Sequence, residues 1–360
     1  MPTLDIAHQR LHNQRLVGAP FERPNDVVRW LGAVQAQDYA GAKWAVAQRT
    51  PGASNAGLDR VFEDGGVLRT HVMRPTWHFV LPADIRWLLA LTGPRVQAVN
   101  AHYDRKLELD DAVFGRSNDL LAAALVGGRQ LTRAELGEVL AAGGISASGQ
   151  RLGYLMMRAE LDGVVCSGGR RGKQFTYALL DKRAPAGREL GREEALAELT
   201  RRYVVSHGPA TVHDFAWWSG LTVADAKVGI ALVGGELLSE TVEGTTYWFS
   251  PPAILADEPS PVVHLLPNYD EHLVAYKDHR ASFDGAVWSR LTPEEPALMG
   301  HIVVVDGLVV GGWRRTERRG EVTVTTTLLV GLSEDERAAL RDAAARYGRF
   351  VGLPVVVEGG

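Results

Sequence analysis

The pattern of hydrophobic and polar positions predicts helices first and then a β-hairpin. Apolar residues after Pro24 recur at intervals of three and four positions, which is typical of the buried face of a helix over residues 24–35. Residues 67–80 are rich in β-branched and aromatic side chains, and they predict two strands that turn at Arg74 and Pro75. Further helices are expected over residues 42–48, 55–64 and 83–91. Helices followed by a hairpin are the element order of a winged helix.

The same order of elements recurs twice, as a repeat of pattern rather than of sequence. Thr132 is placed to cap a helix that carries Leu136 and Leu140, and a second helical stretch then leads into strand-forming residues. A third copy is expected over residues 192–249. In the second copy, helices are expected from residue 131 and over 148–161, and strands over 163–166 and 175–177. In the third copy, helices are expected over 196–205 and 212–219, and strands over 236–238 and 245–249.

Prolines and a change of composition predict a separate C-terminal domain. Pro251, Pro252, Pro259 and Pro261 mark a linker, after which strand-forming residues dominate and one helix is expected over residues 334–347. This pattern predicts a β-rich barrel or sandwich. Its expected strands cover 262–266, 273–276, 301–305, 308–313 and 322–330. A polar stretch at 107–117 indicates an earlier boundary, and the expected domains are 1–110, 111–184, 185–252 and 253–360.

Composition places the chain among ordinary globular proteins. Its 360 residues are 46% hydrophobic and 23% charged, enough for two or three compact units. No apolar run approaches the roughly 18 residues of a membrane span, and no signal peptide is evident, so we expect a soluble cytoplasmic protein. The single cysteine, Cys166, excludes an internal disulfide and a cysteine-cluster metal site.

The net charge of −4 excludes a polybasic protein, so binding to nucleic acid has to use local patches. Of the 39 basic residues 33 are arginines, which bind phosphate through a planar fork, although a GC-rich genome explains the same bias.

Gln35 and Gln37, separated by the apolar Ala36, form the most distinctive candidate site. Residues two apart point about 200° away from each other in a helix, so both side chains act at one point only where the backbone is extended or turning. Two carboxamides offer acceptors and donors but no strong acid or base, which suits holding a water and stabilising a developing cation. The structural alternative is a solvated helix end, with Asp38 starting the next helix.

The predicted hairpin over residues 67–80 carries a second candidate site. In strand geometry Thr76 and His78 share one face while Trp77 and Phe79 take the other, so a polar face and a core face are expected. Arg74 and His78 would then reach a ligand or a phosphate, unless the histidines are structural. A zinc site is not favoured, because the histidines lack metalloenzyme spacing and no cysteine partner exists.

Two basic segments are candidates for contact with DNA phosphates. Residues 151–183 hold seven basic and three acidic residues, and a second basic cluster covers 314–320. Each is also explained by a solvated loop. Motifs of phosphate-binding loops, α/β-hydrolases and dinucleotide-binding folds are not found. The candidate DNA-contacting residues are Arg170, Arg171, Lys173, Arg314, Arg315, Arg318 and Arg319.

Four segments, over residues 30–39, 69–80, 265–273 and 310–314, resemble the winged-helix proteins of the AlkZ/YcaQ DNA glycosylase superfamily. The resemblance spans nearly the whole chain. It implies an α+β fold with three tandem winged-helix domains and a C-terminal β-barrel, C-shaped around duplex DNA, with no metal and no organic cofactor. It also implies that Gln35 and Gln37 are catalytic. Arg74, Thr76 and His78 match a family hairpin and are expected near the active site.

The resemblance implies a monofunctional DNA glycosylase that hydrolyses the N-glycosidic bond of cationic N-alkylated purines such as N7-alkylguanine. Bulky natural-product adducts and interstrand crosslinks are candidate substrates, in self-resistance to a genotoxin. The expected partner is double-stranded DNA, bound by a monomer in the nucleoid, with the lesion met inside the duplex rather than in a closed pocket. Asp38 is the alternative general base, beside the two glutamines.

Two other classes of function stay open from the sequence. A non-catalytic winged-helix protein, either a transcription regulator or a factor that sequesters lesions, would keep the DNA contacts without using the glutamines. A metal-dependent hydrolase would be inhibited by chelators.

Overall fold

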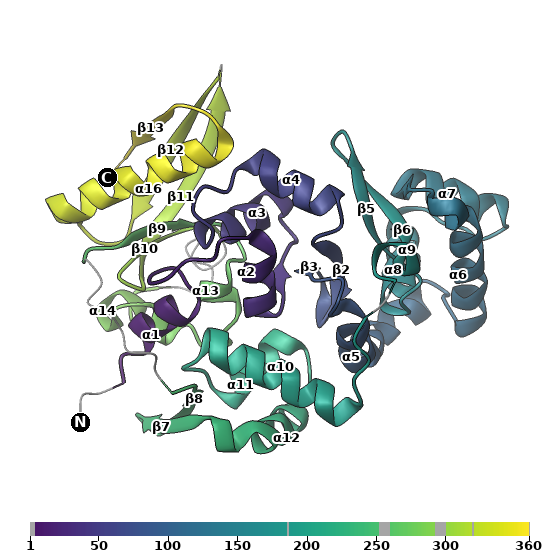
Figure 1. Ribbon diagram of the computed structural model, residues 1–360, viewed down its shortest axis with the longest axis horizontal. Helices are drawn as coiled ribbons and strands as arrows, with labels where there is room; N and C mark the ends of the chain where they lie inside the picture. Colours follow the sequence, from purple (N-terminus) through teal and green to yellow (C-terminus); the bar gives the residue numbers. More distant parts are fainter. Residues whose placement is uncertain (1–3, 186, 252–259, 292–299, 319, 360) are drawn as a thin grey trace. The chain divides into compact units, whose positions relative to one another are not determined.

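The chain forms two compact units in a computed structural model that describes residues 4–185, 187–251, 260–291, 300–318 and 320–359 (Figure 1). The first unit comprises the described parts of Met1–Asp59, Leu199–Trp218 and Val223–Gly360. The second unit comprises the described parts of Arg60–Glu198 together with Ser219–Thr222. None of the described helices is long and apolar enough to cross a membrane.

The first unit begins with short helices whose ends follow from local sequence. α2 (Pro24–Leu31) stops four residues before the predicted end, because Gly32 adopts a φ of 80° that a residue with a side chain rarely takes. α3 (Tyr39–Gln48) starts earlier than predicted, because Asp38 caps it by accepting a hydrogen bond from the backbone N–H of Gly41. The flanking helices are α1 (Ile6–Asn13) and α4 (Asn55–Glu63), which crosses into the second unit.

The C-terminal part of the first unit is a five-stranded sheet with the order β13-β12-β11-β10-β9. α16 (Glu334–Val351) packs along this sheet, as Figure 1 shows. Within the described residues the sheet does not close, so the expected β-barrel is wrong. The helix covers one face, and it carries the chain across so that β13 joins β12 in parallel. The strands are β9 (Val263–Leu266), β10 (Ile302–Val305), β11 (Leu308–Arg318), β12 (Glu321–Leu328) and β13 (Val355–Glu358).

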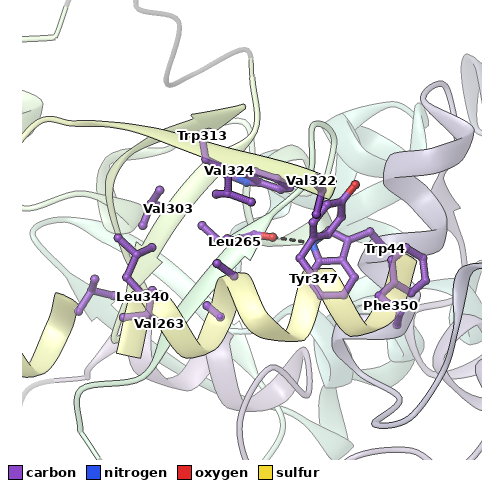
Figure 2. Packing of buried hydrophobic residues seen from close by; sticks show 14 of the residues in the cluster. Trp44, Val263, Leu265, Val303, Trp313, Val322, Val324, Leu340, Tyr347 and Phe350 are labelled. Atoms are coloured by element: carbon purple, nitrogen blue, oxygen red, sulfur yellow. Dashed lines mark hydrogen bonds between the residues drawn. The ribbon is translucent and has the colours of Figure 1, made fainter. Parts of the chain in front are cut away.

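Trp44 of α3 joins the N-terminal helices to this sheet. Its ring packs against Tyr347 and Phe350 of α16, with centroids 5.1 and 5.0 Å away, and its indole N–H donates to the carbonyl of Leu265 at 2.7 Å (Figure 2). The helix α3, which follows the two glutamines directly, is thereby anchored to the buried core.

One of the remaining elements of the first unit differs from the prediction. The expected strand over 273–276 is wrong, because Asp270 caps α13 (Glu271–Val274) instead. α12, the short helix α14 and β13 had no counterpart in the predicted elements. The remaining elements of this unit are α10 (Arg192–His207), whose first residues belong to the second unit, α11 (Val212–Ser219), α12 (Val223–Val233), the hairpin β7 (Leu238–Val242) and β8 (Thr245–Phe249), and α14 (Gly285–Trp288).

The second unit contains the first predicted hairpin, β2 (Leu68–Val72) and β3 (Arg74–Val80). Its turn lies at Met73, with a φ of 66°, and the expected turn residues Arg74 and Pro75 instead begin β3. The following helix α5 (Ile85–Lys106) is much longer than predicted, since it continues through Pro94. Part of the polar stretch at 107–117 lies in α6 (Asp111–Leu125), and the expected boundary between residues 110 and 111 falls at the start of this helix.

Residues 131–183 of the second unit follow the predicted order of helix, helix and hairpin. Thr132 caps α7 as predicted, and Glu135 completes a capping box with it. Leu121, Leu136 and Leu155 meet in a core shared by α6, α7 and α8. The elements are β4 (Leu131–Thr132), α7 (Arg133–Ala142), α8 (Gly149–Leu161), β5 (Val165–Arg171), β6 (Gln174–Leu179) and α9 (Leu180–Arg183), with the strand order β4-β6-β5.

Candidate active site

The two glutamines lie in non-helical backbone between α2 and α3, as the geometric argument requires. β1 (Val34–Gln35) is extended, and the chain bends at Gln37 before α3 begins. The side-chain environments differ: Gln35 is only 5% exposed, whereas Gln37 is exposed to solvent. Ala36 between them is fully buried and holds the segment against the core. Gln37 is therefore the carboxamide that a substrate reaches most directly.

A buried carboxylate, Glu271 at the start of α13, fixes the backbone of this segment. The N–H of Gln35 donates to Glu271 Oε1 at 3.0 Å, and Trp218 Nε1–H donates to Oε2 at 2.8 Å. Glu271 is only 1% exposed, so these bonds are made away from competing water. Because Glu271 lies in the segment over residues 265–273, this contact explains why two distant parts of the chain belong to one site.

The neighbouring acid, Asp270, holds the other end of α3. Its two carboxylate oxygens each accept from the guanidinium of Arg49 at 2.9 Å, and both side chains are fully buried. Burial by itself raises the pKa of Asp270, but the charge and hydrogen bonds of Arg49 outweigh burial and lower that pKa below its usual range. Adjacent residues 270 and 271 thus tie both Gln35 and the end of α3 to α13.

Asp38, the alternative general base, has a structural role as the cap of α3. Its Oδ1 accepts from the N–H of Gly41 at 3.0 Å. A Cβ at position 41 would lie 2.7 Å from Asp38 Oδ2 and 3.3 Å from Pro267, so the cap requires glycine there. The carboxylate is half-buried and engaged, as the structural reading of this residue predicts.

His301 and Asn268 join this region, and the sequence analysis missed both. The backbone N–H of Asn268 donates to His301 Nδ1 at 2.7 Å, so a neutral ring carries its proton on Nε2. Nε2 lies 3.2 Å from Nη1 of Arg315. Burial and then the charge of Arg315 lower the pKa of His301 to about 4, against the opposing effect of Asp38. Two donors therefore lie side by side, an arrangement that favours an anionic oxygen.

The sequence carried one usable signal for this cluster. Asn268 and Arg314 lie in the segments that resemble the family, and Arg315 follows directly, whereas His301 is a single histidine before a strand and belongs to no motif.

The hairpin residues Arg74, Thr76 and His78 lie on β3 in the second unit. The expected separation of a polar face from a core face is wrong. His78, Phe79 and Val80 are all buried, in a hairpin that contacts α5, α8 and β5. Burial, followed by the charge of Arg74, lowers the pKa of His78 well below its usual range. Thr76 Oγ1 and His78 Nε2 have no hydrogen-bond partner in the described part of the chain.

The candidate DNA-contacting residues differ in their exposure and in the side chains that they contact. Arg171 is paired with Glu135 at 2.7 Å and also donates to the carbonyl of Gln130. Arg170 lies over the ring of Phe175, 5.2 Å from its centroid, while Lys173 is exposed at the hairpin turn. In the first unit Arg314 and Arg318 are exposed, and Arg315 contacts His301. Arg319 lies outside the described residues.

The described side chains form no cluster typical of a metal site. Over residues 4–359, apart from the undescribed gaps, no group of three or more His, Cys, Asp or Glu side chains is placed to hold a metal ion.

We expect the folded protein to lose stability in mild acid, because burial lowers the pKa of two histidines. Burial is the main cause that lowers the pKa of His272 and of His301 to about 4. The unfolded chain, with histidine pKa values near ~6.5, binds more protons below that pH, so the free energy of unfolding is highest above ~6.5 and falls towards pH 4. For the fully buried His272 the loss is about 2 kcal/mol at pH 5. Urea unfolding at pH 7.5 and pH 5 measures it.

The matched control for this pH dependence is an exposed histidine. His272→Asn should reduce the difference between the two pH values, whereas His102→Asn on the surface of α5 should leave it unchanged. Equal stability of the wild-type protein at the two pH values would contradict the prediction.

The chain belongs to the AlkZ-like DNA glycosylase family, whose profile, described as "DNA glycosylase AlkZ-like", matches residues 28–350. It is 27% identical to the "Interstrand DNA cross-link repair glycosylase" of Streptomyces sahachiroi over 375 aligned positions, which cover 96% of each chain. It is also similar to the solved structure of Streptomyces sahachiroi DNA glycosylase AlkZ, with a TM-score of 0.80, 25% identity and 98% of each chain covered.

Proposed function

We propose that this protein is a monofunctional DNA glycosylase that removes cationic N-alkylated purines, N7-alkylguanine above all, from double-stranded DNA. The observation that carries the proposal is the Gln35–Gln37 segment, held in extended backbone by Glu271 with Gln37 open to solvent. It occurs in a chain that matches the AlkZ-like family over most of its length. The relative's activity on interstrand cross-links makes bulky and crosslinked adducts candidate substrates in self-resistance to a genotoxin.

The charge of the substrate explains why amides suffice. A purine alkylated at a ring nitrogen is already positive, so it leaves with the electron pair of the C1′–N bond and needs no general acid. The remaining task is to support the cationic sugar and to deliver water to C1′. We assign this task to the carbonyl oxygens of Gln35 and Gln37, which are uncharged acceptors. The nucleophile is water and no amine attacks the sugar, so the strand stays intact.

Cationic and polar residues of both units would hold the DNA. Arg314, Arg318 and Lys173 are exposed cations suited to backbone phosphates, and His301 with Arg315 offers two adjacent donors. We place Arg74, Thr76 and His78 near the lesion, because Thr76 and His78 each bury a polar atom that finds no hydrogen-bond partner among the residues that the structure describes. The three helix–hairpin segments would act as winged helices around a duplex, in which a bulky lesion is met without being flipped out.

The test incubates duplex DNA containing N7-methylguanine with the purified protein and measures released base and alkali-sensitive sites. We expect base release that leaves an abasic site without strand cleavage, and that persists in the presence of EDTA. DNA binding without base release would favour a regulator or a lesion-sequestering factor. Loss of activity on chelation would favour a metal-dependent hydrolase.

A further inference from the structure

A second candidate binding site lies entirely within the second unit, separate from the two glutamines. A pocket of about 700 Å³ lies between the β2–β3 hairpin, the start of α7 and the β5–β6 hairpin. Three cationic side chains line it, Arg69, Arg133 and Lys173, and no acidic residue is among its described lining residues. Such a surplus of positive charge in an acidic protein indicates an anionic ligand.

Arg69 is held in place by two aromatic rings of the pocket wall. Its guanidinium carbon lies 4.3 Å from the ring centroid of Trp77 and 4.5 Å from that of Phe175. The side chain is only 8% exposed, so its charge is largely removed from water. A planar guanidinium fixed between two rings is already oriented for an oxyanion, and loses little freedom on binding one.

The wall of the pocket formed by α7 and β6 offers further donors, although Arg133 also donates to the carbonyl of Gly149 at 3.5 Å. Arg133 is the exposed first residue of α7, where the first N–H groups of the helix have no intrahelical acceptor. Tyr177 is only 7% exposed and lines the same pocket. Burial raises the pKa of Tyr177 above its usual range, so the hydroxyl remains a neutral donor. A neutral hydroxyl donor beside three cationic side chains suits an oxygen of an anionic ligand.

We propose that this pocket binds one phosphodiester group of the DNA backbone. Arg133, Lys173 and the hydroxyl of Tyr177 would hold the phosphate, and Leu152 with Phe175 would contact the deoxyribose. The pocket is much larger than a phosphate alone, and its apolar wall suits the sugar. The proposal rests on the proposed function for the identity of the ligand as DNA. It assigns Arg69, Arg133 and Tyr177 to DNA binding, in place of Arg171, which Glu135 already pairs.

The experiment measures binding of a fluorescent, unmodified duplex by anisotropy over a series of salt concentrations. We expect the Arg133→Gln, Lys173→Gln double variant to bind about tenfold more weakly, with the salt slope reduced by about 0.9 for the lost phosphate contact. The loss should be the same for different duplex sequences. Tyr177→Phe, which removes only the hydroxyl, should weaken binding about threefold at an unchanged melting temperature.

The control is Lys106→Gln, which removes an exposed positive charge of the same unit outside the pocket and outside the basic segment 151–183, and should leave affinity unchanged. If the double variant kept the wild-type affinity and salt slope, the assignment of the pocket to DNA binding would be wrong. Base release by the wild-type protein would still support the glycosylase activity. Weaker duplex binding by the variants, in a protein that releases no alkylated base, would support the pocket and overturn the enzyme. Binding of free dAMP is measured in parallel. If the double variant lost dAMP binding but kept its affinity for the duplex, the pocket would be assigned to a free nucleotide and the proposal would be overturned.

Discussion

Gln37→Ala is expected to lower the rate of base release from N7-methylguanine DNA by about 100-fold or more, the usual effect of removing one group that stabilises developing charge. Gln37 is exposed, so its truncation should change neither the fold nor the affinity for DNA. The measurement is a single-turnover rate, with anisotropy and thermal unfolding recorded on the same preparation. An unchanged rate would remove Gln37 from the mechanism.

The partner glutamine needs a variant that keeps the core filled. Gln35 is buried, and Gln35→Met keeps its length and its backbone bond to Glu271 while removing the carboxamide. We expect a similar loss of rate with a smaller loss of stability than in Gln35→Ala. Asp38→Asn is the matched comparison, because asparagine caps a helix as well as aspartate does. A crippled Asp38→Asn beside a nearly active Gln37→Ala would transfer the role of base to Asp38.

Asp270→Ala is expected to lower the free energy of unfolding by about 3–5 kcal/mol, the usual cost of leaving one member of a buried ion pair alone. Arg49 would keep its charge in a fully buried position without the two bonds to the carboxylate. The same variant should slow base release, because Asp270 also caps the helix that presents Glu271 to Gln35. Urea unfolding at pH 7 measures the loss.

The control for this variant is a solvent-exposed pair. Asp26→Ala removes the partner of Arg23 and Arg29 at the start of α2 and should cost about 1 kcal/mol or less. Replacing Arg49 and Asp270 together by apolar residues should recover part of the loss, because no uncompensated charge remains. An equal loss in Asp26→Ala and Asp270→Ala would contradict the buried-pair argument.

The sequence by itself determined the features that depend on neighbouring residues. The helix cap at Thr132, the helix over residues 149–161 and the end of a helix beside the glutamines were predicted, the last of them four residues too late, because each follows from local hydrogen bonds and spacing. The family followed in the same way, from short segments that resemble it, and the comparison over residues 28–350 confirmed it.

Only the tertiary structure decided what depends on residues far apart in the chain. An alternating strand pattern is the same in a barrel and in an open sheet. In this fold the sheet stays open, and α16 packs against it. The bond from Gln35 to Glu271 joins residues 236 positions apart, and no local pattern records such a contact. The burial of Gln35, the position of His301 and the pocket around Arg69 arise in the same way, because burial and charge pairing are properties of the folded surface rather than of the neighbouring sequence.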